Sequence, residues 1–178
     1  AQTLEKCILS VVNQSYKKIE FIVIDGGSTD GTLDILAKYD HVIDYWISEP
    51  DSGVYHAWNK AIAASNGEWL SFLGADDIYL DGAVTAYVSA IIGHADEPVD
   101  YVSSKINLVK DGKELRTVGK KWDWMSFKQL TGIAHVGSFH NKTLFEEYGL
   151  YNTDYKICGD YELLLRPGET LKAVFIDI

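Results

Sequence analysis

The chain has 178 residues, of which 47% are hydrophobic and 24% are charged, and its formal net charge is −10. This length suits one domain with a substantial core, and the composition is that of an ordinary globular protein rather than a disordered or fibrous one. The acidic balance argues against a nucleic-acid-binding surface, because phosphate backbones attract Lys and Arg. It is still compatible with the binding of a phosphorylated small molecule if a divalent cation lies between the phosphate and the acidic side chains.

The sequence also bears on location. No apolar run approaches the roughly 20 residues that a bilayer-spanning helix needs, and the opening residues do not have the pattern of a signal peptide. Cys7 and Cys158 are far apart and flanked by apolar residues, which predicts two buried free thiols rather than a disulfide or a metal site. We therefore expect a reducing, cytoplasmic compartment.

The first half of the chain alternates between helical and strand patterns. Apolar residues recur with helical spacing over residues 3–12, and the β-branched run 19–24 predicts a buried strand. Further strands are predicted at 44–48 and 68–73, and further helices at 32–39, 54–65 and 82–92. This alternation predicts a mostly parallel sheet with helices on its faces.

The second half is more irregular. Segments 101–109 and 114–119 flank Asp111-Gly112 and predict a β-hairpin. Short helices are predicted at 123–129, 142–148 and 159–165, and strands at 136–140 and 171–178. We expect a single domain over 1–178, with a nucleotide-binding half over 1–94 and an acceptor-side half over 95–178.

Acidic residues follow three of the predicted strands. Asp25 ends the first, Glu49 and Asp51 follow the second, and Asp76 and Asp77 follow the third. Ligands of open parallel sheets collect at the carboxyl ends of the strands, so three acidic strand ends predict a shared site. Each acid alone is better explained as a turn former or a helix cap than as a ligand.

Two of these acidic segments have a chemistry of their own. The first is the segment Asp25-Gly26-Gly27-Ser28-Thr29-Asp30-Gly31. Glycines such as Gly27 allow the backbone to approach a ligand closely, and Asp25 can accept a hydrogen bond from a base N–H or a ribose hydroxyl. Asp30 is expected to be structural, at the start of the next helix. The Asp76-Asp77 pair suits Mg²⁺ or Mn²⁺, which prefer oxygen ligands. The alternative for this pair is interaction with the dipole of the following helix.

Taken together, several blocks resemble the inverting family 2 glycosyltransferases with a GT-A fold that build bacterial polysaccharides. They are Asp25-Gly-Gly-Ser-Thr-Asp-Gly-Thr, Ser48-Glu-Pro-Asp-Ser-Gly-Val-Tyr, Ala57-Trp-Asn-Lys-Ala-Ile, Phe72-Leu-Gly-Ala-Asp-Asp, His135, Phe145-Glu-Glu-Tyr-Gly-Leu-Tyr and Cys158-Gly-Asp-Tyr-Glu-Leu-Leu-Leu-Arg. The resemblance implies transfer of a sugar from a nucleotide-diphosphate donor, UDP-sugar first, to a hydroxyl of a glycan or lipid-linked acceptor. It also implies peripheral association with the inner face of the membrane, and it leaves the oligomeric state open.

The resemblance also implies roles for single residues. Asp25 and Asp51 would hold the nucleoside, Asp76 would ligate the metal that bridges the diphosphate, and Asp77 would add a second carboxylate or support the first. Asp160 matches the general base that takes the proton of the attacking hydroxyl. Gly74 stands where the family's DxD motif has its first Asp, which leaves fewer protein ligands.

Three residues on the acceptor or diphosphate side have competing explanations. His135 matches a histidine near the acceptor, but it also fits a core position. Arg166 suits a phosphate, Asp160 or a solvated helix end. Trp124, beside Trp122, suits stacking on a sugar or packing in the core.

The chain also departs from the family, which opens with a strand just before the helix expected at 3–12. We expect that strand, and a C-terminal extension, to be missing from this sequence. The alternatives to an active transferase are therefore a module that binds a nucleotide sugar without turnover or a truncated inactive domain. A nucleotidyltransferase fits less well, because the sequence has no glycine-rich loop with Arg and Lys near its start.

Overall fold

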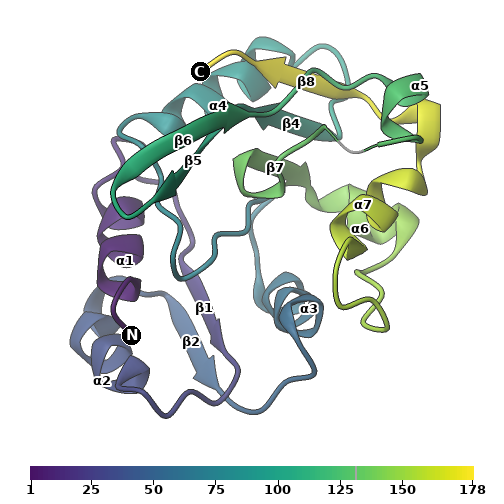
Figure 1. The fold of residues 1–178 in the computed structure, drawn as a ribbon. Helices are drawn as coiled ribbons and strands as arrows, with labels where there is room; N and C mark the ends of the chain where they lie inside the picture. The colour runs from purple at the N-terminus through teal and green to yellow at the C-terminus, as the bar shows by residue number, and fades with distance from the viewer. Residues whose placement is uncertain (131) are drawn as a thin grey trace. The chain divides into compact units, whose positions relative to one another are not determined.

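The computed structural model describes residues 1–130 and 132–178. It divides into two compact units, each assembled from separate stretches of the chain (Figure 1). Unit 1 comprises Ala1–Glu68, Leu73–Thr85 and Leu150–Gly159, and unit 2 comprises Trp69–Phe72, Ala86–Gly149 and Asp160–Ile178. The acids expected to bind the donor and its metal thus belong to unit 1, and Asp160 and His135 belong to unit 2.

Unit 1 contains a pair of parallel strands with helices. Its elements are α1 (Leu4–Val12), β1 (Ile22–Asp25), α2 (Thr32–Tyr39), a 3₁₀ turn (Asp40–Val42), β2 (Tyr45–Ser48) and α3 (Val54–Ala64). The strands pair in parallel, from Ile22 opposite Tyr45 to Asp25 opposite Ser48. Leu4 and Ile8 lie one helical turn apart on α1 and form a buried cluster with Leu36 and Ile43.

The returning segment of unit 1 is fixed to α3 by hydrogen bonds. The Asn59 side chain accepts a hydrogen bond from the Tyr151 backbone N–H and donates one to the Tyr151 carbonyl, at 3.0 and 2.8 Å. The Tyr55 hydroxyl accepts a hydrogen bond from the Gly159 backbone N–H at 2.8 Å, and the rings of Tyr55 and Tyr151 stack. The residue immediately before Asp160 is therefore held by α3.

Unit 2 is built around a four-stranded mixed sheet with the order β3-β7-β4-β8. The strands are β3 (Trp69–Leu70), β4 (Tyr101–Ser104), β7 (Ser138–Asn141) and β8 (Ala173–Ile176). Strand β7 runs antiparallel to β3 and β4, while β4 and β8 are parallel. Tyr101 and Val102 on β4 are fully buried, as expected of a central strand.

A separate hairpin and short helices complete the chain. The hairpin consists of β5 (Ile106–Lys110) and β6 (Lys113–Val118), joined by Asp111 and Gly112, both with positive φ. The helices are α4 (Ala83–Gly93), α5 (Trp124–Phe127), α6 (Lys142–Tyr148) and α7 (Gly159–Leu165), with 3₁₀ turns at His135–Gly137 and Gly168–Thr170. Positive φ at both turn residues matches the Asp-Gly turn expected from the sequence.

Most expected elements are present, but several differ. In place of one mostly parallel sheet, the chain has the parallel pair β1 and β2 and a separate mixed sheet of four strands. The hairpin arm expected at 101–109 divides into β4 and β5, and only β5 pairs with β6. The strand expected at 68–73 is only Trp69–Leu70, and the first two residues of the strand expected at 136–140 belong to the 3₁₀ turn His135–Gly137. The prediction that both cysteines are buried is wrong for Cys158, which is exposed on a loop with a φ of 65°, whereas Cys7 is buried as expected. Helices long and apolar enough to cross a bilayer are absent from the described residues.

Candidate functional site

Asp25, at the end of β1, accepts four hydrogen bonds. One carboxylate oxygen, Oδ2, accepts hydrogen bonds from the Gly27 and Ser28 backbone N–H groups and from the Ser48 hydroxyl, at 3.0, 2.8 and 2.6 Å. The other, Oδ1, accepts one from the Ser28 hydroxyl at 2.6 Å. Burial alone would raise the pKa of this carboxyl, but the bonds from Ser28, Ser48 and Gly27 outweigh it and lower the pKa. Asp25 therefore stays charged, and it holds the loop after β1 against the end of β2.

Asp51 lies against this same loop. A Cβ atom on Gly26 would stand 2.8 Å from Asp51 Oδ2, so only glycine permits this approach. Asp51 Oδ1 accepts a hydrogen bond from the Gly53 backbone N–H at 2.8 Å, and Gly27, with a φ of 88°, lies beside the Pro50 backbone. The structure therefore brings Asp25, Gly27 and Asp51 together, as the two adjacent acidic strand ends predict.

Asp30 has the structural contacts expected of it. Its carboxylate accepts hydrogen bonds from the Thr32 hydroxyl at 2.7 Å and from the Thr32 backbone N–H at 3.3 Å. Asp30 therefore orders the start of α2.

Asp76 and Asp77 form a crowded pair beside Gly74. A Cβ atom on Gly74 would stand 2.8 Å from Asp77 Oδ2 and 3.1 Å from Asp76 Oδ1. Burial and the neighbouring Asp76 raise the pKa of the Asp77 carboxyl, while one hydrogen bond from the Gly74 backbone N–H opposes the rise. A side chain at position 74 would therefore displace one of these two acids.

Cys7 lies beneath the same loop. Its thiol donates a hydrogen bond to the Gly74 carbonyl at 3.4 Å. Burial, followed by the charges of Asp77 and Asp76, raises the pKa of the Cys7 thiol to about 11. The group therefore stays protonated and serves as packing rather than as a nucleophile or a metal ligand.

The Asp76–Asp77 pair matches the donor preference of Mg²⁺ or Mn²⁺. Two carboxylates that repel each other are stabilised by a cation, and both ions accept phosphate and water oxygens as further ligands. Within residues 1–130 and 132–178, no group of three or more His, Cys, Asp or Glu side chains gathers into a metal site. Asp76 and Asp77 are therefore the carboxylates that could hold such an ion beside Gly74.

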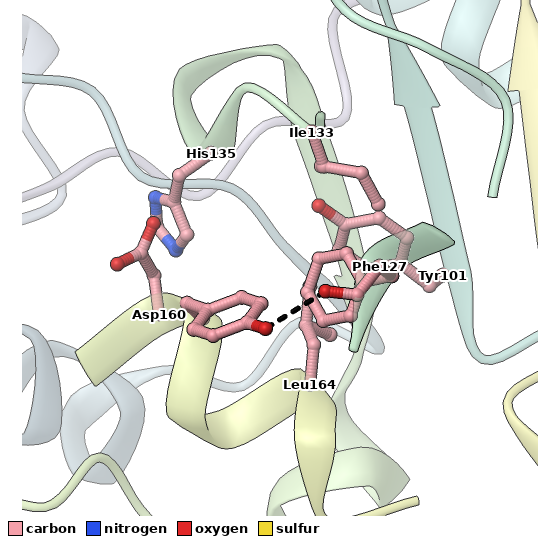
Figure 2. Close-up of a pocket in the computed structure, with 7 residues that line it drawn as sticks. Tyr101, Phe127, Ile133, His135, Asp160 and Leu164 are labelled. Carbon is pink, nitrogen blue, oxygen red and sulfur yellow. Dashed lines mark hydrogen bonds between the residues drawn. The ribbon is translucent and has the colours of Figure 1, made fainter. Parts of the chain in front are cut away.

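In unit 2, Asp160 lines a small cavity together with His135 (Figure 2). The side chains of Asp160 and His135 point toward each other across it. The other lining residues are mainly aromatic or aliphatic, namely Tyr101, Phe127, Ile133, Tyr161 and Leu164. The cavity volume is about 10 Å³, room for one water-sized group.

The hydroxyl groups of the two tyrosines in this cavity are engaged elsewhere. Tyr161 donates a hydrogen bond to the Phe127 carbonyl at 2.8 Å, drawn as a dashed line in Figure 2. The Tyr101 hydroxyl donates to the Ser138 hydroxyl, and burial raises the pKa of Tyr101 well above its usual range. Asp160 and His135 are therefore the polar side chains best placed to contact a group that enters the cavity.

His135 is kept neutral by its surroundings. Burial lowers the pKa of its imidazole to about 3, and its ring lies 5.5 Å from that of Phe72 and 5.2 Å from that of His140. His140 is fully buried, and burial followed by the neighbouring His135 lowers the pKa of its imidazole well below 6.5. A neutral His135 can accept or donate a hydrogen bond without adding positive charge beside Asp160.

Arg166 and Trp124 have structural contacts of their own. Arg166 donates two hydrogen bonds to the Glu162 carboxylate, at 2.9 and 2.6 Å, and one to the Tyr148 carbonyl at 2.8 Å. Trp124 stacks on Trp122 with ring centroids 6.4 Å apart, and its ring lies 3.6 Å from the position of a Cβ atom on Gly168. The contacts of Trp124 match its packing alternative, whereas Glu162 and Tyr148 are partners of Arg166 that the sequence did not indicate. The binding roles of both residues stay predictions.

The structure adds residues that the sequence did not indicate. Ser28 and Ser48 hold Asp25, and Phe127, Tyr101 and Tyr161 shape the cavity beside Asp160. Tyr161 was identifiable only as the neighbour of Asp160. Ser28 lies three residues after Asp25, whereas Ser48, Tyr101 and Phe127 come from segments distant in sequence from the acids that they accompany.

Comparison with known proteins identifies the family of the chain. Glycosyl transferase family 2 matches residues 1–154, and the chain belongs to this family. A PGL/p-HBAD biosynthesis glycosyltransferase of Mycobacterium bovis is 32% identical, over 93% of this chain and 64% of the relative. The chain thus spans about two thirds of the length of this relative.

Two solved structures share the fold. S. aureus TarS 1-349 in complex with UDP matches 99% of this chain and 57% of its own, with a TM-score of 0.76 and 16% identity. The mannosyltransferase PcManGT of Pyrobaculum calidifontis, in complex with GDP-Man and Mn²⁺, matches 99% of this chain and 51% of its own, with a TM-score of 0.73 and 21% identity. The predicted GT-A fold class is thereby confirmed.

Proposed function

We propose that this chain is the catalytic domain of an inverting glycosyltransferase, which moves a sugar from a nucleotide-diphosphate donor to a hydroxyl of a glycan or lipid-linked acceptor. The observation that carries the proposal is the small cavity lined by Asp160 and His135, whose side chains point toward each other. Family membership supports the same reaction class. UDP-sugar is the first candidate donor, because one structural neighbour binds UDP.

The proposed reaction is a single displacement. The acceptor hydroxyl loses its proton to the Asp160 carboxylate while its oxygen forms a bond to the anomeric carbon of the donor. The bond between that carbon and the diphosphate oxygen breaks, and the nucleoside diphosphate leaves with the bonding electrons. Attack from the side opposite the leaving group inverts the anomeric centre.

Each group of unit 1 has a part in holding the donor. Asp25 and Asp51 would contact the nucleoside, and Asp25 also orders the loop against which Asp51 lies. Asp76 and Asp77 would hold Mg²⁺ or Mn²⁺, which when bound offsets the negative charge of the leaving diphosphate. Mn²⁺ in the complex of the mannosyltransferase neighbour supports this assignment.

The Asp160→Asn variant tests the base. The amide keeps the size of the carboxylate but cannot take the proton, so the rate of sugar transfer should fall by about 10²- to 10⁴-fold while UDP-sugar affinity is retained. A thermal-shift screen of nucleotide sugars first identifies the donor. Sugar transfer, including slow transfer to water, is then measured as UDP release in the presence of Mn²⁺. Asp154→Asn, the same change at an exposed loop position, is the matched control.

Two outcomes would contradict parts of the proposal. Full activity of Asp160→Asn would exclude Asp160 as the base. If the unaltered chain binds a nucleotide sugar tightly but releases no UDP with any acceptor tested, the chain is a binding module rather than a catalyst.

A further inference from the structure

Basic residues are concentrated in one segment of this acidic protein. Residues 106–121, which we call the basic hairpin, contain five basic and two acidic residues, whereas the whole chain has 16 basic and 26 acidic residues. The five cations are Lys110, Lys113, Arg116, Lys120 and Lys121, and all are exposed. The basic hairpin therefore carries a local positive charge in a chain whose net charge is −10.

These cations are available to an external partner. Within the described part of the chain, none of the five forms a salt bridge, whereas Lys105 just before the hairpin pairs with Asp177. Exposed lysines also protect edge strands against pairing with other chains, and that protective role explains part of the pattern.

Protection does not explain the exposed apolar residues of the hairpin. Val109 and Leu115 are 60% and 64% exposed. The register shift between Leu108 and Val109 makes Leu115 an extra residue, so that Glu114 and Leu115 lie opposite Val109. Val109 and Leu115 thus lie close in sequence to exposed cations near the turn of the two-stranded hairpin. The hairpin itself is the pair β5 and β6 in Figure 1.

The hairpin is attached firmly at its base. A Cβ atom on Gly119, which has a φ of 123°, would stand 2.5 Å from the Ser104 carbonyl oxygen, so the returning strand passes closely against the end of β4. A Cβ atom on Gly137 would similarly meet the Ile106 side chain at 2.6 Å. The base of the hairpin is therefore held close to strand β4 of unit 2.

We propose that the basic hairpin docks this protein on an anionic bilayer surface. Anionic headgroups attract clustered Lys and Arg, and exposed apolar side chains between the cations enter the boundary with the acyl chains. The acidic remainder of the chain is repelled by the same surface, so the charge distribution turns the hairpin toward the membrane. Lipid is favoured over nucleic acid because Val109 and Leu115 have a use at a bilayer and none on a phosphate backbone. This inference goes beyond the proposed transfer and holds whether or not that activity is found.

Vesicle sedimentation tests the proposal with the full chain. Wild-type protein should bind phosphatidylcholine vesicles that contain 30% phosphatidylserine or phosphatidylglycerol, and should not bind phosphatidylcholine alone. Each cation removed should lower the partition coefficient about fivefold, so the triple variant K110Q/K113Q/R116Q should bind these vesicles about 100-fold more weakly. The control K6Q/K17Q/K18Q removes three exposed lysines of unit 1 and the same total charge, and should keep the binding.

A second variant separates insertion from charge. V109S/L115S keeps every cation and should also weaken binding to the anionic vesicles, while circular dichroism confirms that both hairpin variants are folded. Absence of wild-type binding, equal loss in the control, equal binding to neutral vesicles, or tighter binding of a single-stranded nucleic acid than of anionic vesicles would each overturn the proposal.

Discussion

Polar groups are buried in two regions of this protein, and burial has opposite effects on their charge. Asp25 in unit 1 receives four hydrogen bonds and remains a carboxylate with a lowered pKa. His135 and His140 in unit 2 lie among aromatic rings, and burial keeps them neutral. Hydrogen bonds therefore decide whether a buried group stays ionised. Asp77, with one hydrogen bond from Gly74 and a like charge beside it, is an intermediate case with a raised pKa.

The largest expected effect comes from the histidines. Because the pKa of each is lowered in the folded state, the unfolded chain takes up protons first as the pH falls below 6.5, and the folded state loses stability. Between pH 7 and pH 5 we expect a loss of about 2 kcal/mol per histidine, or about 4 kcal/mol for the pair. Urea unfolding followed by circular dichroism at the two pH values measures it.

The variant His140→Phe separates the two histidines. It keeps an aromatic ring in the cluster and should remove about half of the pH dependence, whatever its effect on stability at pH 7. An unchanged difference between pH 7 and pH 5 in this variant would show that His140 is not held neutral by burial.

Asp25→Ala should have the next largest effect. It leaves two hydroxyls and two backbone N–H groups without their acceptor, at a cost of about 3 kcal/mol in the free energy of unfolding. Urea unfolding at pH 7 measures this loss. Asp34→Ala, at an exposed position of α2, is the control and should stay within about 0.5 kcal/mol of wild type. A loss at Asp25 no larger than the control's would mean that this carboxylate does not hold the loop.

Asp76→Ala tests an acid that we propose binds a metal, in contrast to Asp25, which holds a loop. The exposed, crowded carboxylate contributes little to folding, so stability should hold, while Mn²⁺-dependent UDP affinity falls by about 100-fold, or ~2.7 kcal/mol. Isothermal titration calorimetry with and without Mn²⁺ is the measurement, and Asp81→Ala in the following loop is the control. Unchanged affinity would remove Asp76 from the metal assignment.

The smallest expected effect is that of Ser48→Ala. Loss of the 2.6 Å hydrogen bond to Asp25 should cost about 1.5 kcal/mol of stability and raise the pKa of the Asp25 carboxyl, because a bond to its charged form is lost. NMR titration of the Asp25 carboxyl carbon reports the pKa shift. If the pKa of Asp25 stays the same or falls, the hydrogen bond from Ser48 does not help to offset the effect of burial on this carboxyl.

Local patterns in the sequence predict much of the fold. The alternation of apolar runs predicts the parallel pair β1 and β2, and Asp111-Gly112 predicts the hairpin, because each depends on neighbouring residues. Acids at adjacent strand ends likewise predict that Asp25 and Asp51 meet. By contrast, the partnership of Asp25 with Ser48 depends on strand pairing across 23 residues, and the cavity of Asp160 combines residues from Tyr101 to Leu164. Such contacts between distant segments arise only in the folded chain.

The two cysteines give this protein a natural place for a reporter group. Cys7 is buried with its thiol pKa raised to about 11, so it reacts slowly with alkylating reagents, whereas Cys158 is exposed. A fluorophore or spin label should therefore attach selectively at Cys158, two residues before Asp160, without any substitution. Events at the cavity could then be followed by spectroscopy in the unmutated chain.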